Sequence, residues 1–294
     1  MKIVLTGSLG NISKPLAIQL IAARNQVTIV SSQAAKAAAI EAIGAAAAIG
    51  SVEDAAFLTG VFTGADVVYT MIPPNFGVPD LRAYMGRVGN SYATAIKNAG
   101  ITRVVNLSSI GAHLSEGTGP IKGVHDTELL LNQLPGVAVK HLRAPFFFTN
   151  FFNDIPMIKH QGIMGANYPA ATRLVMVHPE DIAAAVAEEI QLPFNGKTVR
   201  YLASDESTPG EAAKLLGNAI GKPGLPWVTF TDEQALNGML QAGIPQEMAE
   251  NFTEMGTALR AGKLWEDFDN HQPASRGKWR LADFATVFAA AYNN

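Results

Sequence analysis

The sequence contains no cysteine, so disulfide bonds, thiolate nucleophiles and cysteine-ligated metals are excluded. Charged residues make up only 16% of the 294 residues, and the formal net charge is −3. This balance lacks the basic footprint of a protein that binds a nucleic-acid backbone, so we expect no nucleic-acid partner. The 48% of hydrophobic residues is instead typical of a folded globular chain.

Long apolar runs are also missing. No stretch is long enough, and free enough of glycine, proline and charge, to span a bilayer, and no secretory signal is visible. We therefore expect a cytoplasmic protein without a membrane partner. The 6 histidines include no H-x-x-x-H pair, which argues against a metal site.

The first half of the chain alternates short apolar, β-branched runs with helical patterns. We expect strands at Ile3–Thr6, Val27–Val30, Ala46–Ile49, Val67–Met71, Arg103–Leu107 and Val137–Leu142, and helices at Pro15–Ala23, Ala34–Ile43, 53–58, Leu81–Ala99 and Val124–Leu134. Continuously apolar strands separated by helices indicate a parallel sheet covered on both faces. The sequence therefore predicts an α/β fold with a doubly wound, Rossmann-type sheet.

The sequence pattern changes after Leu142, where an aromatic-rich run and irregular segments precede more helical patterns. We expect a smaller, mostly helical second domain, with the chain recrossing between the two. Two capping-box patterns, Thr208 to Glu211 and Thr231 to Gln234, predict helix starts in it. The predicted division gives residues 1–145 and 175–204 to the dinucleotide-binding domain and residues 146–174 and 205–294 to the substrate-side domain. Met248, Phe252, Met255 and Leu259 form an amphipathic helical stripe, which we interpret as core or lid packing.

A glycine loop follows the first expected strand and opens the first expected helix. Its residues are Gly7, Ser8, Leu9, Gly10, Asn11 and Ile12. Gly7 permits a tight turn, Gly10 permits close approach of a pyrophosphate, and the helix N-terminus offers free amide donors. An ordinary tight turn is the alternative, but the strand–loop–helix context favours dinucleotide binding.

The end of the second expected strand bears on the choice of cofactor. NAD-preferring proteins carry an acidic residue there to hold the ribose 2′-hydroxyl. This chain has Ser31 and Ser32 instead, with Lys36 one turn later. The pattern favours NADP(H) over NAD(H), although the two serines are also compatible with simple capping of the next helix.

Several segments together resemble the NmrA-like family of atypical short-chain dehydrogenases/reductases. They are Thr6-Gly7-x-x-Gly10, Met71-Ile72-Pro73-Pro74, Asn106-Leu107-Ser108-Ser109, Leu142-Arg143-Ala144-Pro145-x-Phe147-Phe148-x-Asn150 and His178-Pro179-Glu180-Asp181-Ile182-Ala183. The family includes NAD(P)H-dependent quinone, azo-dye and triarylmethane-dye reductases, and also redox-sensing members that bind the dinucleotide without turning it over.

The resemblance implies roles for particular positions. Residues Gly7 to Ile12 would hold the pyrophosphate, and Ser31 and Ser32 the adenosine ribose. Met71, Ile72 and Pro73 would line the adenine or ribose side, and Ser108, Ser109 and Ile110 would lie near the nicotinamide ribose. The segment 145–150, with Pro145, Phe146, Phe147, Phe148 and Asn150, would form the nicotinamide-end wall and the mouth of the substrate pocket. The residues themselves add Tyr168, which could build an apolar slot together with the aromatic run.

The usual acid–base pair of short-chain dehydrogenases is absent, because none of the 6 tyrosines has a lysine four residues later. Lys122, His125 and Glu128 instead share one face of an expected helix. As a functional set, Lys122 would bind the nicotinamide ribose of the cofactor and would form a catalytic pair with His125, which would donate a proton; a solvated helix face is the alternative.

Without the tyrosine–lysine pair, the chemistry left to the chain is hydride transfer to an acceptor that needs little proton transfer from the protein. A quinone or similar conjugated aromatic substrate fits this requirement, and the aromatic run would supply an apolar slot. The alternative is a non-catalytic NAD(P)-sensing protein that binds a protein partner. The sequence leaves open whether the amphipathic C-terminal helix packs within the chain or across a homodimer.

Overall fold

The computed structural model describes all residues 1–294, and its centre is a sheet of seven parallel strands. Their order is β10-β6-β5-β4-β1-β2-β3, with bounds β1 Lys2–Leu5, β2 Gln26–Ser31, β3 Ala46–Ile49, β4 Val67–Thr70, β5 Arg103–Ser109, β6 Ala138–Ala144 and β10 Lys197–Tyr201. The order reverses between β1 and β4, the position at which doubly wound sheets bind ligands. The predicted Rossmann-type sheet is confirmed.

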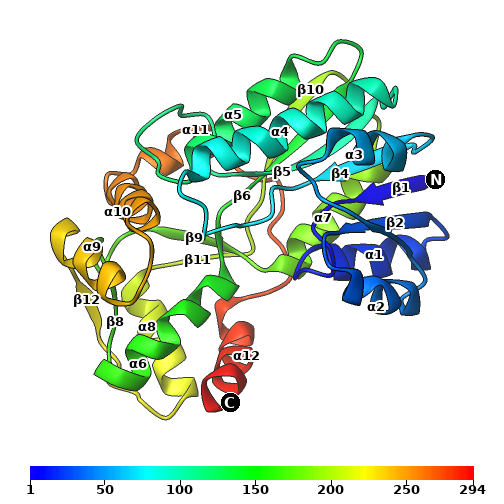
Figure 1. Ribbon diagram of the computed structural model, residues 1–294. Helices are drawn as coiled ribbons and strands as arrows, with labels where there is room; N and C mark the ends of the chain where they lie inside the picture. The colour runs from blue at the N-terminus through cyan, green and yellow to red at the C-terminus, as the bar shows by residue number, and fades with distance from the viewer.

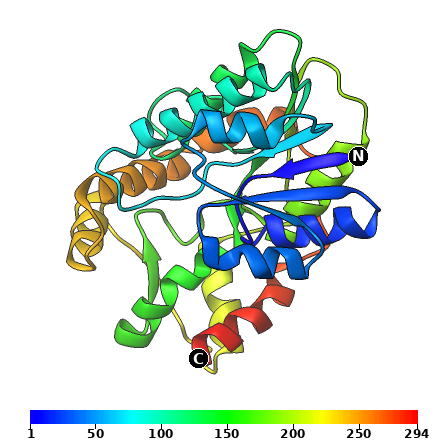
Figure 2. The same ribbon diagram turned by 45° about the vertical axis from the view of Figure 1, so that its right-hand side comes forward.

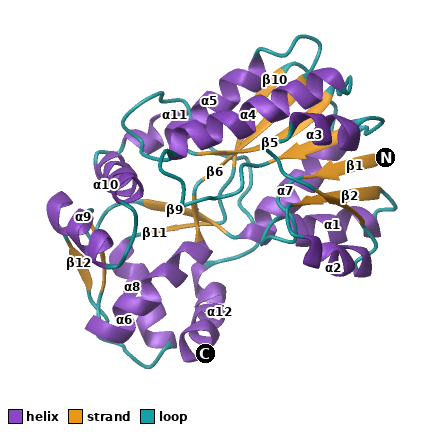
Figure 3. Ribbon diagram, viewed as in Figure 1, coloured by secondary structure: helices purple, strands orange, loops and turns teal.

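Helices cover both faces of this sheet (Figure 3). One face carries α1 Ser13–Ala22, α2 Ala37–Ala42, which follows the short 3₁₀ turn Ala34–Lys36, and α7 Pro179–Gln191; the other carries α3 Ala55–Phe62, α4 Leu81–Asn98 and α5 Ile121–Asn132. Each face has its own apolar core, so strand residues are buried on both sides.

The remaining elements form a second body beside the sheet, toward the C-terminus in Figure 1. It contains a small sheet of β7 Phe146–Phe147, β9 Leu174–Val177 and β11 Asp205–Ser207, and a pair of β8 Met164–Ala166 with β12 Trp227–Thr229. Its helical segments are the 3₁₀ helix η2 Phe148–Asp154, α6 Ile155–Gln161, α8 Pro209–Ala219, α9 Asp232–Gln241, α10 Gln246–Arg260, the 3₁₀ helix η3 Lys263–Trp265, α11 Glu266–Asn270 and α12 Leu281–Asn293. Within segment 175–204, β10 therefore joins the main sheet, whereas β9 pairs in the small one.

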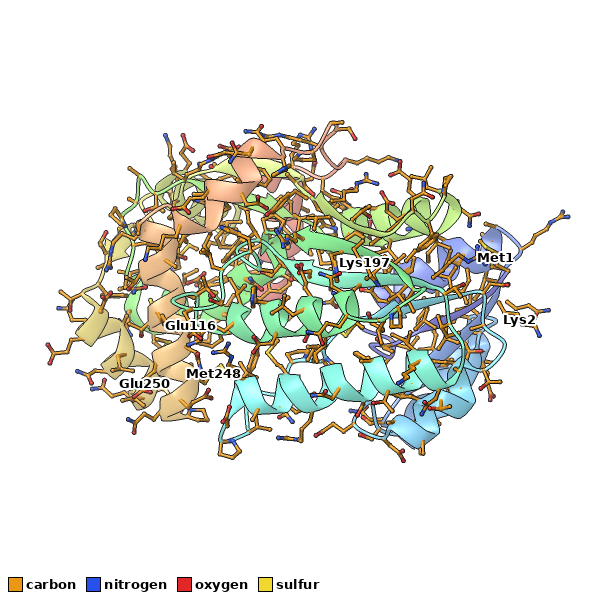
Figure 4. All side chains as sticks on the ribbon, turned by 90° about the horizontal axis from the view of Figure 1, so that it is seen from above. Met1, Lys2, Glu116, Lys197, Met248 and Glu250 are labelled. Atoms are coloured by element: carbon orange, nitrogen blue, oxygen red, sulfur yellow. The ribbon has the colours of Figure 1, made fainter.

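Helix α10 connects the two bodies by crossing the starts of α4 and α5 (Figures 2 and 4). The Glu247 carboxylate accepts the amide of Leu81 at 3.3 Å, and Glu254 accepts the amide of Gly119 at 3.0 Å. Carboxylates near helix N-termini are stabilised by the free amides and the helix dipole. Met248 is buried against the core of α3 and α4, so the predicted amphipathic stripe is in part core packing.

A buried charge cluster centred on Arg143 joins the same two bodies. Arg143 on β6 bonds Glu128 of α5 at 2.7 Å and Asp267 of α11 at 2.8 Å, and it is only 7% exposed. The hydroxyls of Ser108 and Tyr201 donate to Glu128 and Asp267 respectively. Because the Arg143 cation bonds the two carboxylates and the Tyr201 hydroxyl, the charges are tolerated in the interior.

Two capping boxes predicted by sequence spacing are present. Thr208 exchanges hydrogen bonds with Glu211 at the start of α8, and Thr231 does so with Gln234 at the start of α9. None of the helices is both long and apolar enough to cross a membrane.

The Arg143→Met variant tests the cluster. Loss of the guanidinium leaves Glu128 and Asp267 without their cation, and we expect a cost of about 3–5 kcal/mol in the free energy of unfolding, measured by urea denaturation. The matched control is Arg173→Met, because Arg173 pairs with Glu206 and Asp269 but is one-third exposed. It should cost about 1 kcal/mol or less. Equal losses in the two variants would contradict the special role of Arg143.

Candidate cofactor and substrate cavity

A cavity of about 2060 Å³ opens along the carboxyl ends of strands β1 to β6. Pockets for one small ligand reach about 1,000 Å³, so this volume suits a dinucleotide together with a second molecule. One end is lined by the glycine loop after β1, and the other by aromatic residues of the second body. The cavity therefore continues from the sheet edge into the second body.

The glycine loop is shaped for a ligand. Gly7 has φ +98°, and a Cβ there would lie 2.7 Å from the Ser13 hydroxyl oxygen. The amides of Asn11, Ile12 and Ser13 have no acceptor within the protein. Free amides at the start of α1, with no side chain at Gly7, form a ready site for a phosphate group.

The end of β2 lies beside this loop. The Ser8 hydroxyl donates to the Ser31 hydroxyl at 2.9 Å, and Ser31 also accepts the Gln33 amide at 3.2 Å. Ser31 is 3% exposed, so its hydroxyl fixes the loop against the strand. Ser32 is exposed and Lys36 is half-buried, and both line the cavity with polar groups that bond nothing in the protein, so they are free for a ligand.

Other strand ends complete the dinucleotide half of the cavity. The predicted residues Met71, Ile72, Pro73, Ser108, Ser109 and Ile110 all line it. The Ser108 hydroxyl is turned to Glu128, and the Ser109 hydroxyl donates to the Ile110 carbonyl at 2.9 Å. Sequence reasoning missed the segment 50–53 after β3, which also lines the cavity. Its signal was its position, since it directly follows a strand of the same parallel sheet.

The far end of the cavity is aromatic. Its lining includes Pro145, Phe146, Phe147, Asn150 and Tyr168, which the sequence analysis names, together with Phe151, Trp227 and Trp265. The rings of Phe146 and Phe151 lie 5.0 Å apart, and Tyr168 stacks on Trp227 at 5.4 Å. These rings give the wall of a slot for a planar apolar molecule.

Phe148 and Leu9 require correction. Phe148 is fully buried and stacks on Phe284 at 5.5 Å, so it belongs to the core of the second body and not to the substrate pocket. The Leu9 side chain packs against the core beneath α1 and does not line the cavity. In both cases the side chain is directed to the core, away from the cavity lined by its neighbours.

The placement of Lys122 and His125 also differs from the sequence prediction. Neither lines the cavity. The Lys122 ammonium pairs with Glu254 of α10 at 2.7 Å, and His125 Nδ1 bonds the Ala112 carbonyl at 2.8 Å. The face they share with Glu128 is covered by other segments, so it is neither catalytic in geometry nor a solvated surface.

Asp154, which the sequence analysis did not single out, lies at the aromatic end. Its carboxyl lines the cavity, is half-buried and forms no hydrogen bond or ion pair. Burial raises the pKa of Asp154 to about 7. Burial and the nearby Asp154 carboxylate raise the pKa of Tyr168.

The family assignment rests on most of the chain. Residues 1–275 match the model of the NmrA-like family. The chain belongs to this family. The predicted resemblance, made from the glycine loop and four further segments, is thereby confirmed.

Known relatives extend along nearly the full length. An NAD(P)H azoreductase of Xenophilus azovorans is 24% identical over 292 residues, covering 99% of each chain. The NADPH complex of the quinone oxidoreductase QOR2 of Escherichia coli has a TM-score of 0.80 at 21% identity, covering 97% of this chain and 99% of that one. Triphenylmethane reductase of Citrobacter sp. has a TM-score of 0.81 at 19% identity, covering 99% and 100%. At these identities the two structures establish a shared fold.

The Gly7→Ala variant tests the glycine loop. The new methyl group would crowd Ser13 and Met71 and strain the positive φ, so we expect the dissociation constant for NADPH to rise at least about tenfold, measured by fluorescence titration. Gly64→Ala is the matched control, because Gly64 also has positive φ (+78°) but open space around it. Unchanged binding by Gly7→Ala would contradict this role.

Proposed function

We propose that the protein reduces quinones or similar conjugated aromatic compounds with NAD(P)H and prefers NADPH. The observation that carries this proposal is the continuity of the cavity. It runs from the free amides after Gly7 to the Phe146–Phe151 wall. The activities of the azoreductase and quinone oxidoreductase relatives support the same class of reaction.

The residues present fit a dinucleotide. The space left by the missing Cβ of Gly7 and the unpaired amides of Asn11, Ile12 and Ser13 suit the pyrophosphate. Strand ends at Met71–Pro73 and Ser109–Ile110 flank the path toward the aromatic end. When bound, the reduced nicotinamide supplies a hydride; the protein supplies position and surroundings.

The chemistry at the aromatic end excludes the tyrosine–lysine mechanism. Only Tyr84 and Tyr168 among the tyrosines line the cavity, and the Tyr84 hydroxyl donates to the Pro73 carbonyl at 3.0 Å. Lys36 is the one lysine that lines it, at the opposite end. Apolar rings that orient an electron-poor substrate and displace water instead favour direct hydride delivery.

The preference for NADPH rests on Ser32 and Lys36, which line the cavity in the segment directly after β2, a segment that has no carboxylate of its own. We expect Lys36→Ala to weaken NADPH binding about tenfold and NADH binding little, because only NADPH carries the 2′-phosphate. Paired fluorescence titrations with NADPH and NADH give the ratio of the two dissociation constants. Lys97→Ala, at an exposed lysine away from the cavity, should leave it unchanged. An equal loss for both cofactors would contradict the assignment.

A steady-state panel tests the activity itself. Purified protein is expected to oxidise NADPH in the presence of quinones or azo dyes, with kcat/KM higher for NADPH than for NADH. Phe146→Ala should raise KM for the aromatic acceptor while leaving the NADPH dissociation constant unchanged, because the ring lies at the substrate end. Cofactor binding without turnover of any acceptor would favour the sensing alternative.

A further inference from the structure

Reduction of a quinone needs one proton beyond the hydride. The balanced reaction is quinone plus NAD(P)H plus a proton giving hydroquinone plus NAD(P)⁺. The hydride brings both electrons to the acceptor, and the resulting hydroquinone anion takes a proton on oxygen. A positioned acid on the cavity wall accelerates the reaction when it delivers that proton as charge develops.

Few groups on the cavity wall can carry a proton. The titratable residues that line it are Lys36, Glu53, Tyr84, Asp154, His160 and Tyr168. Glu53 pairs with Arg87 at 2.8 Å, and Tyr84 bonds a carbonyl, both on the dinucleotide side with Lys36. Asp154, His160 and Tyr168 remain at the aromatic end.

Asp154 is distinguished by its position. It ends the 3₁₀ helix η2, three residues after Phe151, and residues three apart eclipse each other along such a helix. Its carboxyl is thus on the side of η2 that carries the Phe151 ring, which packs on Phe146. It makes no hydrogen bond and no ion pair, so both of its oxygens are free to bond a ligand. Its partial exposure to the cavity leaves a route for a proton from solvent.

We propose that Asp154 is the proton donor of this site: its carboxylic acid protonates the oxygen or nitrogen anion of the reduced aromatic acceptor and is then reprotonated from solvent. The O–H bond of the acid breaks as the new bond to the acceptor forms. This inference rests on the proposed function.

The groups around Asp154 allow its titration near neutral pH. Helices α6 and α12 pack against η2, and Tyr168 lies near Asp154. The charged and titratable residues of these two helices are Lys159 and His160 of α6 and Asp283 and Tyr292 of α12. The Lys159 ammonium lies 5.3 Å over the Tyr292 ring, and Asp283 accepts the Arg280 amide at 3.0 Å. Burial without a cationic partner keeps the acid form of Asp154 up to about pH 7.

The Asp154→Asn variant, which keeps the shape but cannot donate a proton as an acid, tests the proposal. We expect kcat to fall about 100-fold with the NADPH dissociation constant unchanged. In the wild type kcat should decline as pH rises through about 7, since the acid form is lost, and this decline should vanish in the variant. The loss should also be greater for acceptors whose reduced anions are more basic, a trend that a structural defect would not produce.

His160→Gln and Tyr168→Phe are matched controls at the same end of the cavity, and both should keep the pH decline. Asp154→Glu should restore part of the rate. An Asp154→Asn enzyme with wild-type kcat and an unchanged pH profile would overturn the proposal alone. A wild-type protein that reduces no acceptor while binding NADPH would overturn the proposed function and the proton donor with it.

A measurement without catalysis checks the protonation state. The folded protein holds a proton on Asp154 between about pH 4 and 7 that the unfolded chain has already lost, so this group's contribution to stability falls as pH rises across that range. We therefore expect the Tm of Asp154→Asn minus the Tm of the wild type to be more positive at pH 8 than at pH 4. The same difference in Tm at both values would show that Asp154 is not the neutral-pH acid required.

Discussion

The parallel direction of the central strands is the constraint on which the rest of the structure depends. Because β1 to β6 all end at one edge, the segments that follow them meet there without any of them being close in sequence. The glycine loop, the Ser31 turn, Met71–Pro73 and Ser108–Ile110 are each short and ordinary alone. Together they form one continuous wall, and the reversal of strand order between β1 and β4 opens the space they enclose.

Packing between distant parts of the chain then fixes what this wall faces. Arg143 ties β6 to α5 and α11, and Glu247 and Glu254 tie α10 to the starts of α4 and α5. These contacts hold the second body against the strand ends, so that the aromatic slot continues the dinucleotide groove. The polar groups most visible in the sequence of α5 are used for this attachment, which leaves the cavity end with a single unpaired carboxyl, Asp154.

Local features were predictable, and long-range burial was not. Gly7 and the two capping boxes follow from backbone geometry within a few residues, and both were read correctly. Lys122 was misplaced because its partner Glu254 lies 132 residues away, and helical spacing gives a shared face without saying what covers it. Asp154 was missed for the same reason, although a carboxylate within the aromatic run of 146–154 was a signal that could have been used.

Hydride transfer from NADPH to an aromatic acceptor in this cavity is tested most directly by an anaerobic single-turnover experiment. Protein loaded with NADPH that carries deuterium at both C4 positions is mixed with a quinone, and NADPH absorbance is followed against the unlabelled cofactor. The account predicts that the absorbance disappears with formation of hydroquinone, and more slowly with deuterium. Tight binding of NADPH with no loss of absorbance for any quinone or azo acceptor would contradict it.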